Sequence, residues 1–265
     1  MTPAEAHLER TIVDALVARG WREGAAARFD ATLALLPGDL VDWLRGAYPV
    51  VHRRLAEAHG ELLAERLSRA LDEALRAHGT PTVLRDGFRF EGEQLPVAFF
   101  PPPAPHDAET AARLGHQRLV VTRQVRIEPA GRNSLDLLLS LNGIPLVTVE
   151  LKCRQNEQSV EDAKKQYSER PKSLPIFAWP SRAVVHFAVD DQEAWMTTRV
   201  RGDETTFVPF NRGTASGDAG TPPQRGQWLP HGLPLEGSLG ARELPHPAGA
   251  LRPRAGGERL SLIHI

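Results

Sequence analysis

Two acidic side chains and one lysine interrupt an otherwise apolar stretch of the sequence, residues 133–154 (NSLDLLLSLNGIPLVTVELKCR). Asp136 lies in the first apolar run, and Glu150 and Lys152 lie near the end of the second. A charged side chain within a buried strand is costly unless it is paired or binds a metal ion. These three residues are therefore the first candidates for chemistry.

The Asn142-Gly143 dipeptide between the two runs predicts a two-residue hairpin turn. Around such a turn, residues whose numbers add to about 285 face each other, so Asp136 lies within one position of Glu150. Side chains two apart leave the same face of a strand, which puts Lys152 beside Glu150. The sequence thus predicts a compact cluster of two carboxylates and one ammonium.

This cluster suits metal-assisted hydrolysis of a phosphodiester. Two carboxylates on rigid strands offer the hard oxygen ligands that Mg²⁺ prefers, and the ion can stabilise charge on a phosphate and help to ionise water. A lysine can orient or deprotonate the attacking water or stabilise the transition state. The alternative is an ordinary exposed trio, in which the Glu150–Lys152 ion pair contributes little. The apolar surroundings favour the metal site.

The surrounding helices and strands are predicted from the spacing of apolar residues and from capping and turn residues. Residues 2–19 predict a helix with a capping-box start, residues 39–47 a short helix, and residues 50–78 one long helix with a leucine stripe. Strands are expected over 82–100, which is broken by Asp-Gly and Glu-Gly turns.

Further along the chain, the pattern continues to alternate between strand and helix. Strands are expected at 118–128, 134–141, 145–152, 183–189 and 194–200, and a helix at 158–170. We therefore expect an α/β (α+β) fold with a mixed central sheet flanked by helices and with a helical N-terminal region.

Composition excludes several classes of protein. The chain has 265 residues, 41% of them hydrophobic, and a net charge of −1, which leaves room for a sizeable core but gives no overall basic field for nucleic acid. A single cysteine, Cys153, rules out a disulfide framework within the chain. There is no apolar run long enough for a membrane span and no signal-peptide core. We expect a soluble protein of the cytoplasm.

The C-terminal region has a different character. Residues 214–265 show no helix or strand period, which predicts a disordered tail. The last six residues, LSLIHI, are what the codons CTG TCT CTT ATA CAC ATC encode, and these codons match a sequencing-adaptor sequence. Back-translating residues 227–255 with a one-base shift gives a string with strong helical periodicity that includes TAYLWKEVW. We therefore expect the chain from about residue 224 to be out of frame.

The ordered part of the sequence resembles a known family. The motifs SLDLLLSLNGIPLVTVELK, EDAKKQYSER, RAVVHFAVD and MTTRVRGDETTFVPFNRG are similar to the N-terminal nuclease domain of the restriction (R) subunit of type I restriction–modification enzymes, a member of the PD-(D/E)-x-K superfamily. LERTIVDALVARGW and VLRDGFRF extend the resemblance toward the N-terminus. It implies one nuclease domain over residues 1–213, with its core at 118–200.

The resemblance also assigns roles to single residues. It implies that Asp136 and Glu150 bind the metal and that Lys152 is the catalytic lysine. Glu9 matches an acidic position that contributes to the metal site in many relatives, with a solvated helix glutamate as the alternative. Gln166 matches an accessory glutamine. In relatives a tyrosine follows that glutamine four residues later, whereas Arg170 stands there in this chain.

Several other residues have simpler interpretations. His186 is expected to pack within a strand, Asp190 and Asp191 to form a turn, and Cys153 to be a small packing residue. Basic residues near the cluster in sequence could form a local phosphate-binding surface or a solvated face. They are Arg123, Arg126, Arg132, Lys152, Arg154, Lys164 and Lys165.

No G-x-x-x-x-G-K-[ST] loop occurs in the sequence, so ATP is expected to act only through a motor region outside this chain. The expected function is Mg²⁺-dependent DNA cleavage within a restriction complex, with DNA and the methylation and specificity subunits as partners. The alternatives are a non-catalytic module that docks on DNA or on partner subunits, and a stand-alone nuclease of the same superfamily.

Overall fold

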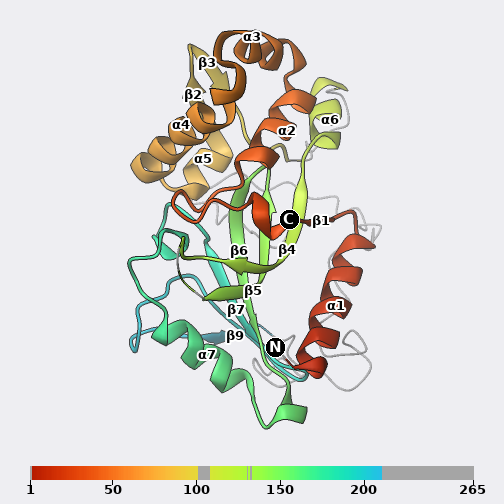
Figure 1. Cartoon of the computed structure of the whole chain (residues 1–265), viewed down its shortest axis with the longest axis vertical. Coiled ribbons are helices and arrows are strands. Elements are labelled where there is room, and N and C mark those ends of the chain that lie inside the picture. Colours follow the sequence, from red (N-terminus) through yellow and green to blue (C-terminus); the bar gives the residue numbers. More distant parts are fainter. Residues whose placement is uncertain (1, 101–107, 130, 132, 211–265) are drawn as a thin grey trace, which may run out of the picture.

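A computed structural model describes residues 2–100, 108–129, 131 and 133–210 (Figure 1). Within these residues most strands form one seven-stranded sheet in the order β1-β4-β5-β6-β7-β8-β9. The β1–β4 and β6–β7 pairs are parallel and the others antiparallel, so the predicted mixed sheet is confirmed. The strands are β1 (Arg22–Gly24), β4 (Leu119–Arg126), β5 (Ser134–Leu141), β6 (Ile144–Leu151), β7 (Val185–Val189), β8 (Ala194–Thr197) and β9 (Val208–Pro209).

The central hairpin of the sheet is β5–β6, joined at Asn142 and Gly143. Both turn residues have positive φ, 51° and 88°, as the predicted tight turn requires. The turn is buried: Asn142 donates to the carbonyl of Val97, and the Leu36 N–H donates to Gly143. A side chain at Gly143 would meet the Leu36 carbonyl at 2.7 Å, so glycine is needed here for close approach as well as for its φ.

The register of this hairpin shifts by one residue part-way along. Near the turn Leu141 faces Ile144, but beyond a bulge at Leu139 and Ser140 the pairing becomes Leu137 with Val149. The shift moves Asp136 from the neighbourhood of Glu150 to the position directly across from it. A bulge therefore completes the alignment that turn geometry alone leaves one residue off.

Helices cover both faces of the sheet (Figure 1). On one face, α1 (Pro3–Val17) packs its Leu8 and Ile12 against Val149 and Leu151 of β6. Alternate residues of β6, Thr148 and Glu150, face the other side. There they contact α7 (Val160–Glu169) through Tyr167, Gln166 and Arg170. The hairpin thus ends between two helices from distant parts of the chain.

A helical part of the fold covers the turn end of the hairpin. It contains α2 (Pro37–Ala47), α3 (Pro49–His59), α4 (Leu63–His78) and α5 (Thr80–Asp86), which surround a core containing Trp43 and the α4 leucines. The small hairpin of β2 (Phe88–Phe90) and β3 (Glu93–Leu95) packs beside them. The carboxylate end of the β5–β6 hairpin points away from this part, toward α1 and α7.

The structure corrects two predicted elements in the helical part. The single helix expected over 50–78 is broken at Gly60, whose φ of 53° and a short 3-10 turn separate α3 from α4. Leu62, counted in the leucine stripe, is consequently 51% exposed. Residues 82–86, expected to belong to a strand region, lie instead in α5 (Thr80–Asp86), which has Pro81 in its first turn.

Three further elements lay outside the sequence expectations. They are β1, which pairs with β4 at one sheet edge, the short edge strand β9, and α6 (Ala108–Gly115) in a segment whose start was expected to be a loop. The predicted capping box of α1 is confirmed, because Thr2 and Glu5 exchange side chain–backbone hydrogen bonds. None of the described helices is both long and apolar enough to cross a membrane.

The expected disordered and out-of-frame tail lies outside the described residues. The expected boundary at residue 213 is likewise untested and stays a prediction.

Candidate functional site

Asp136 and Glu150 meet at the end of the β5–β6 hairpin, as the sequence predicts. The Asp136 Oδ2 atom accepts a hydrogen bond from the backbone N–H of Leu151 at 2.7 Å. A side chain thus takes the place that a backbone carbonyl would hold in a regular ladder, beyond the last backbone pair of Leu137 with Val149.

Glu150 is fully buried and is held from α7. Its Oε2 atom accepts from Nε2 of Gln166 at 2.7 Å, and its Oε1 atom forms an ion pair with Nη2 of Arg170. The pKa of Glu150 is raised to about 8, chiefly by burial and also by the Asp136 charge, while Arg170 opposes both effects. Burial therefore outweighs the ion pair with Arg170.

The position of α7 explains why these two side chains reach Glu150. Residues four apart lie on one face of a helix, so Gln166 and Arg170 point to the same strand. The helix start is fixed by a capping box of Ser159 and Asp162, and by the buried Asp190, whose Oδ2 atom accepts from the Val160 N–H at 3.0 Å. The sequence expectation that Gln166 contacts the site thus agrees with the geometry.

Asp136 is also linked to α1 through a residue that sequence reasoning missed. The Nε2 atom of Gln124 donates to Oε2 of Glu9 at 2.7 Å and to Oδ1 of Asp136 at 3.1 Å. Gln124 has a φ of 51°, which is uncommon for a residue with a side chain and marks a local distortion of β4. Its only sequence signal is a polar residue in a half-apolar strand, and its role depends on the β4–β5 register.

Glu9 is 1% exposed and faces the sheet, so the alternative of a solvated helix glutamate is wrong. Burial raises the pKa of Glu9, and the hydrogen bond from Gln124 and the charge of Arg123, 3.6 Å away, partly oppose that rise. Asp136 raises it as well, which places the two acids within electrostatic reach of each other. Glu9 is thus part of the site's charge balance.

Lys152, the last residue of the strand predicted over 145–152, directly follows the end of β6 at Leu151. Its backbone N–H donates to the carbonyl of Val189 at 2.9 Å, which fixes the chain at this point. Its side chain is half-buried and, among the described residues, forms no hydrogen bond or ion pair. The Lys152 charge lowers the pKa of Glu150, so the ammonium lies near the acids and remains available to a substrate.

A buried polar network lies behind Glu150 on the α7 side. Thr148 Oγ1 is 2.8 Å from the Tyr167 hydroxyl and 2.8 Å from Nδ1 of His186. Burial lowers the pKa of His186 to about 3, so the imidazole is neutral. His186 also packs against Phe177, which confirms the expected packing role. Cys153 is likewise a buried free thiol.

Asp190 does more than form a turn. Besides holding α7, it accepts backbone hydrogen bonds from Gln192 and Glu193 and forms an ion pair with Arg154 at 2.9 Å. Asp191 accepts from the Arg154 N–H at 3.3 Å. The β7–β8 turn is therefore tied to the segment that follows Lys152.

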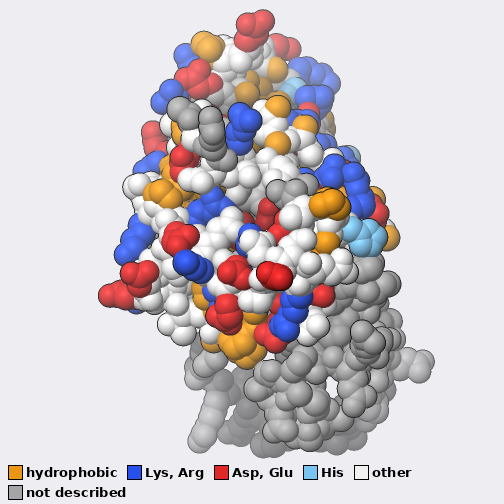
Figure 2. Space-filling view, turned by 60° about the horizontal axis from the view of Figure 1, so that its bottom comes forward, with side chains coloured by type: hydrophobic (Ala, Val, Ile, Leu, Met, Phe, Trp, Pro, Cys, Tyr) orange, Lys and Arg blue, Asp and Glu red, His pale blue; other side chains and the backbone are white. Residues whose placement is uncertain are grey.

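The predicted basic surface is largely neutralised by neighbouring acids. Arg123 pairs with Glu23, Lys164 with Glu161, and Lys165 with Glu169, in addition to the Arg154 pairs. Arg132 lies outside the described residues. Figure 2 shows the end of the molecule that carries α7 and the start of α1, where acidic and basic side chains are interspersed. This face carries no uniform positive field that would by itself attract DNA.

The donor set fits a hard divalent cation. Asp136 and Glu150 supply carboxylate oxygens, each of which can accept more than one interaction, and burial with the neighbouring Asp136 charge raises the pKa of Glu150, an effect that a cation would oppose. Within the described part of the chain, no three His, Cys, Asp or Glu side chains lie close enough to form a metal-binding group. The acids instead form two linked sets, Glu9 with Asp136 through Gln124, and Asp136 with Glu150.

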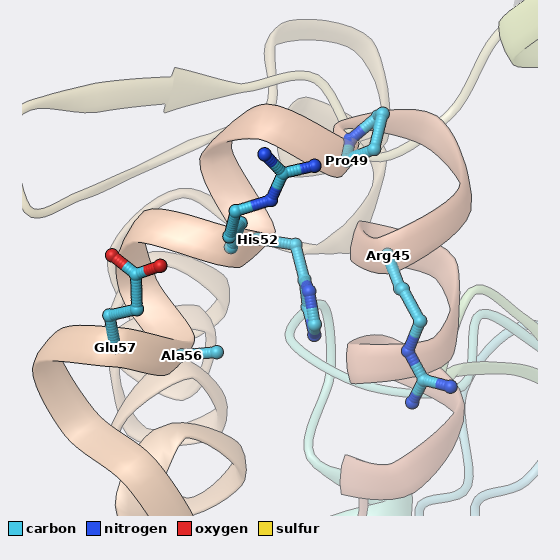
Figure 3. A pocket seen from close by; sticks show the side chains of 6 residues that line it. Arg45, Pro49, His52, Ala56 and Glu57 are labelled. Atoms are coloured by element: carbon cyan, nitrogen blue, oxygen red, sulfur yellow. The ribbon is translucent and has the colours of Figure 1, made fainter.

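A separate hollow lies between α2 and α3, in the helical part. It is lined by Arg45, Pro49, His52, Arg53, Ala56 and Glu57. Figure 3 shows the His52 ring between the two helices and Glu57 on the outer side of α3. Only one acid lines this hollow and none of the site residues reaches it, so it does not belong to the carboxylate site.

Comparison with protein families identifies the segment that forms this site. Residues 107–205 match the family of the type I restriction enzyme R protein N terminus (HSDR_N). This HSDR_N segment runs from α6 through β4 to β8 and includes Asp136, Glu150, Lys152 and Gln166. The resemblance inferred from the sequence motifs is therefore confirmed. Glu9 lies outside the matched residues. No curated protein matches the chain.

Proposed function

We propose that the chain is the nuclease domain of a type I restriction complex and that it hydrolyses DNA phosphodiester bonds with Mg²⁺. The observation that carries this proposal is the meeting of Asp136, Glu150 and Lys152 at the end of one hairpin, within the HSDR_N segment. Family membership supports a role in restriction. The cleavage chemistry is argued from the side chains.

Asp136 and Glu150 would hold the cation, with Glu9 contributing negative charge from α1. A bound Mg²⁺ would neutralise charge on the scissile phosphate and lower the pKa of a water molecule. Lys152, whose ammonium has no partner among the described residues, orients the attacking water or stabilises the charge that develops on the phosphate. Gln124 and Gln166 each donate to one of the two acids, so they keep both carboxylates in place.

ATP would act elsewhere in the complete subunit. In this proposal a translocase outside the chain uses ATP and brings DNA to the nuclease, and the methylation and specificity subunits supply recognition of the DNA sequence. Such delivery would compensate for the mixed charge of the surface in Figure 2, which offers little attraction for free DNA. The proposed location is the cytoplasm, where the DNA and the partner subunits are found.

One observation favours a second candidate, a non-catalytic module that docks on DNA or on the other subunits. Both oxygens of Glu150 are occupied by α7 side chains, and the described residues hold no group of three potential metal ligands. A domain that had lost catalysis could retain such a closed arrangement. The two candidates differ in whether Lys152 and Asp136 are needed for cutting.

The test uses the complete in-frame R subunit, assembled with its methylation and specificity subunits. Linear and plasmid DNA are incubated with Mg²⁺ and ATP, and cleavage and ATP hydrolysis are measured for the wild type, Asp136→Ala and Lys152→Ala. We expect both variants to lose cleavage and to retain ATP hydrolysis. Cleavage by either variant at the wild-type rate would reject the nuclease assignment. A wild-type complex that hydrolyses ATP without cutting would favour the docking module.

A further inference from the structure

Arg170 occupies an unusual position at the end of α7. The residue is 6% exposed, and its Nη2 atom donates both to Oε1 of Glu150 and to the backbone carbonyl of Ser134 at 2.5 Å. The guanidinium thus joins α7 to β5 and β6. Its Nε atom is buried without a partner among the described residues. A buried donor without a partner carries a cost, which the contacts of Nη2 with Glu150 and Ser134 oppose.

The two acids of the site differ in the charge of their donors. Asp136 accepts from the amide of Gln124 and from the Leu151 backbone, both of which are neutral. Glu150 accepts from the neutral Gln166 and from the cationic Arg170. A full positive charge is therefore in direct contact with only one of the two carboxylates.

We propose that Arg170 is a resident counter-ion that competes with the divalent cation for Glu150. This inference rests on the proposed metal site and adds a residue to it. Where Glu150 is ionised and no metal is bound, Arg170 neutralises it and holds its carboxylate in place between β5 and α7. When a cation binds, two like charges share one carboxylate in a poorly screened site, which weakens the affinity for metal. Arg170 is thus a positioning residue that sets the metal concentration at which the site becomes occupied.

The proposal separates the effect of charge from the effect of hydrogen bonding. Arg170 and Gln166 lie one helical turn apart and donate to different oxygens of the same carboxylate. Removing the charge at position 170 should strengthen metal binding, whereas removing the neutral donor at position 166 should not. A purely structural role would make both variants bind metal more weakly or equally.

Mn²⁺ binding to the full 265-residue chain, measured by calorimetry without DNA, tests this difference. We expect Arg170→Gln to bind Mn²⁺ at least about tenfold more tightly than the wild type, since a neighbouring like charge has been removed. Arg170→Lys keeps the charge and Gln166→Met removes only a neutral donor, so both should stay within about threefold. Equal or weaker binding by Arg170→Gln would overturn the proposal.

A second measurement tests the proposal even if Arg170→Gln is less stable than the wild type. The thermal unfolding midpoint is recorded with and without Mn²⁺, because a ligand that binds only the folded state raises the midpoint in proportion to its affinity. Mn²⁺ should raise the midpoint of Arg170→Gln more than that of the wild type, and a smaller rise would overturn the proposal.

Asp136→Asn serves as the control for the metal site itself. If neither the wild type nor Arg170→Gln binds Mn²⁺ in a manner that depends on Asp136, the metal site of the proposed function fails and the inference fails with it. If the wild type binds through Asp136 and Arg170→Gln is no tighter, the inference alone fails.

Discussion

Asp136 uses its side chain to complete the hydrogen bonding of Leu151, with Oδ2 lying 2.7 Å from the backbone nitrogen. This contact gives Asp136 a structural task beside its proposed metal-binding one. It also gives the backbone N–H of Leu151 a partner beyond the last backbone pair of the hairpin, Leu137 with Val149.

The first prediction separates the two tasks of Asp136. Asparagine retains an acceptor oxygen for the Leu151 N–H but has no charge for a metal, whereas alanine leaves that N–H without a partner. Asp136→Ala should therefore be less stable than Asp136→Asn by about 1–3 kcal/mol, and both should lose cleavage. Urea denaturation of the metal-free chain measures the difference. Equal stabilities would mean that the Asp136–Leu151 contact contributes nothing.

The second prediction concerns Lys152, whose ammonium is proposed to act on the substrate and not on the metal. Lys152→Met should reduce cleavage by the assembled complex by about 100-fold or more, as expected for loss of a positioned proton-transfer group. Its Mn²⁺ affinity should stay within about threefold. Lys165→Met is the control, because Lys165 is exposed and pairs only with Glu169 on its own helix. Loss of Mn²⁺ binding in Lys152→Met alone would assign the lysine to the metal site's structure.

The third prediction is a pH dependence of metal binding. The pKa of Glu150 is raised to about 8 from an ordinary value of 4.5, so below pH 8 the metal must displace a proton. Mn²⁺ affinity should rise about tenfold per pH unit up to about pH 8 and level off above it, a gain of about 100-fold between pH 6 and 9. Calorimetry across this range measures the slope.

The same shift affects the stability of the metal-free protein. Between pH 4.5 and about 8 the folded state keeps a proton on Glu150 that the unfolded chain has released. Stability should therefore be fully present below the ordinary pKa and fall as the pH rises through the raised one. Glu150→Gln cannot titrate and should lack this decline. An identical pH profile for Glu150→Gln and the wild type would contradict the raised pKa.

The core of the candidate site could be predicted from sequence because it depends on local rules. The Asn142-Gly143 turn specifies a hairpin, and strand alternation then brings Asp136 to Glu150. Turn geometry leaves the strand register uncertain by one residue. The bulge at Leu139 and Ser140 sets that register, and no local sequence pattern predicts the bulge. Gln166 is identified from the resemblance to the family and not from a local rule.

The contacts of Glu9 and Gln124 could not be predicted because they depend on tertiary packing. They require β4 to lie beside β5 and α1 to cross the sheet at the same level, and the two residues are far apart in the sequence. The helix break at Gly60 was not predicted for a different reason. The leucine spacing continues through it, so periodicity alone favours one helix over the two that form.

The fourth prediction concerns Arg182, which joins the helical part to the sheet. It is 1% exposed, and it donates from Nε to the Leu33 carbonyl at 2.8 Å, from Nη1 to the Ser181 carbonyl at 2.5 Å, and from Nη2 to Asp72 of α4. Burial lowers the pKa of Arg182, and Asp72 opposes that effect. Arg182→Met would leave the two carbonyls without this donor and remove the buried one of the two cations that pair with Asp72. We expect a loss of about 3–5 kcal/mol in the free energy of unfolding.

Arg76 provides a matched control for Arg182 because it pairs with the same carboxylate from the surface. Its side chain is 60% exposed and lies 2.9 Å from Asp72, one helical turn away. Arg76→Ala should cost less than about 1 kcal/mol, as exposed pairs usually do. Urea denaturation of both variants gives the comparison. If the two substitutions cost the same, the buried contacts of Arg182 do not hold the helical part on the sheet, and the attachment must depend on the apolar contacts of the hairpin turn.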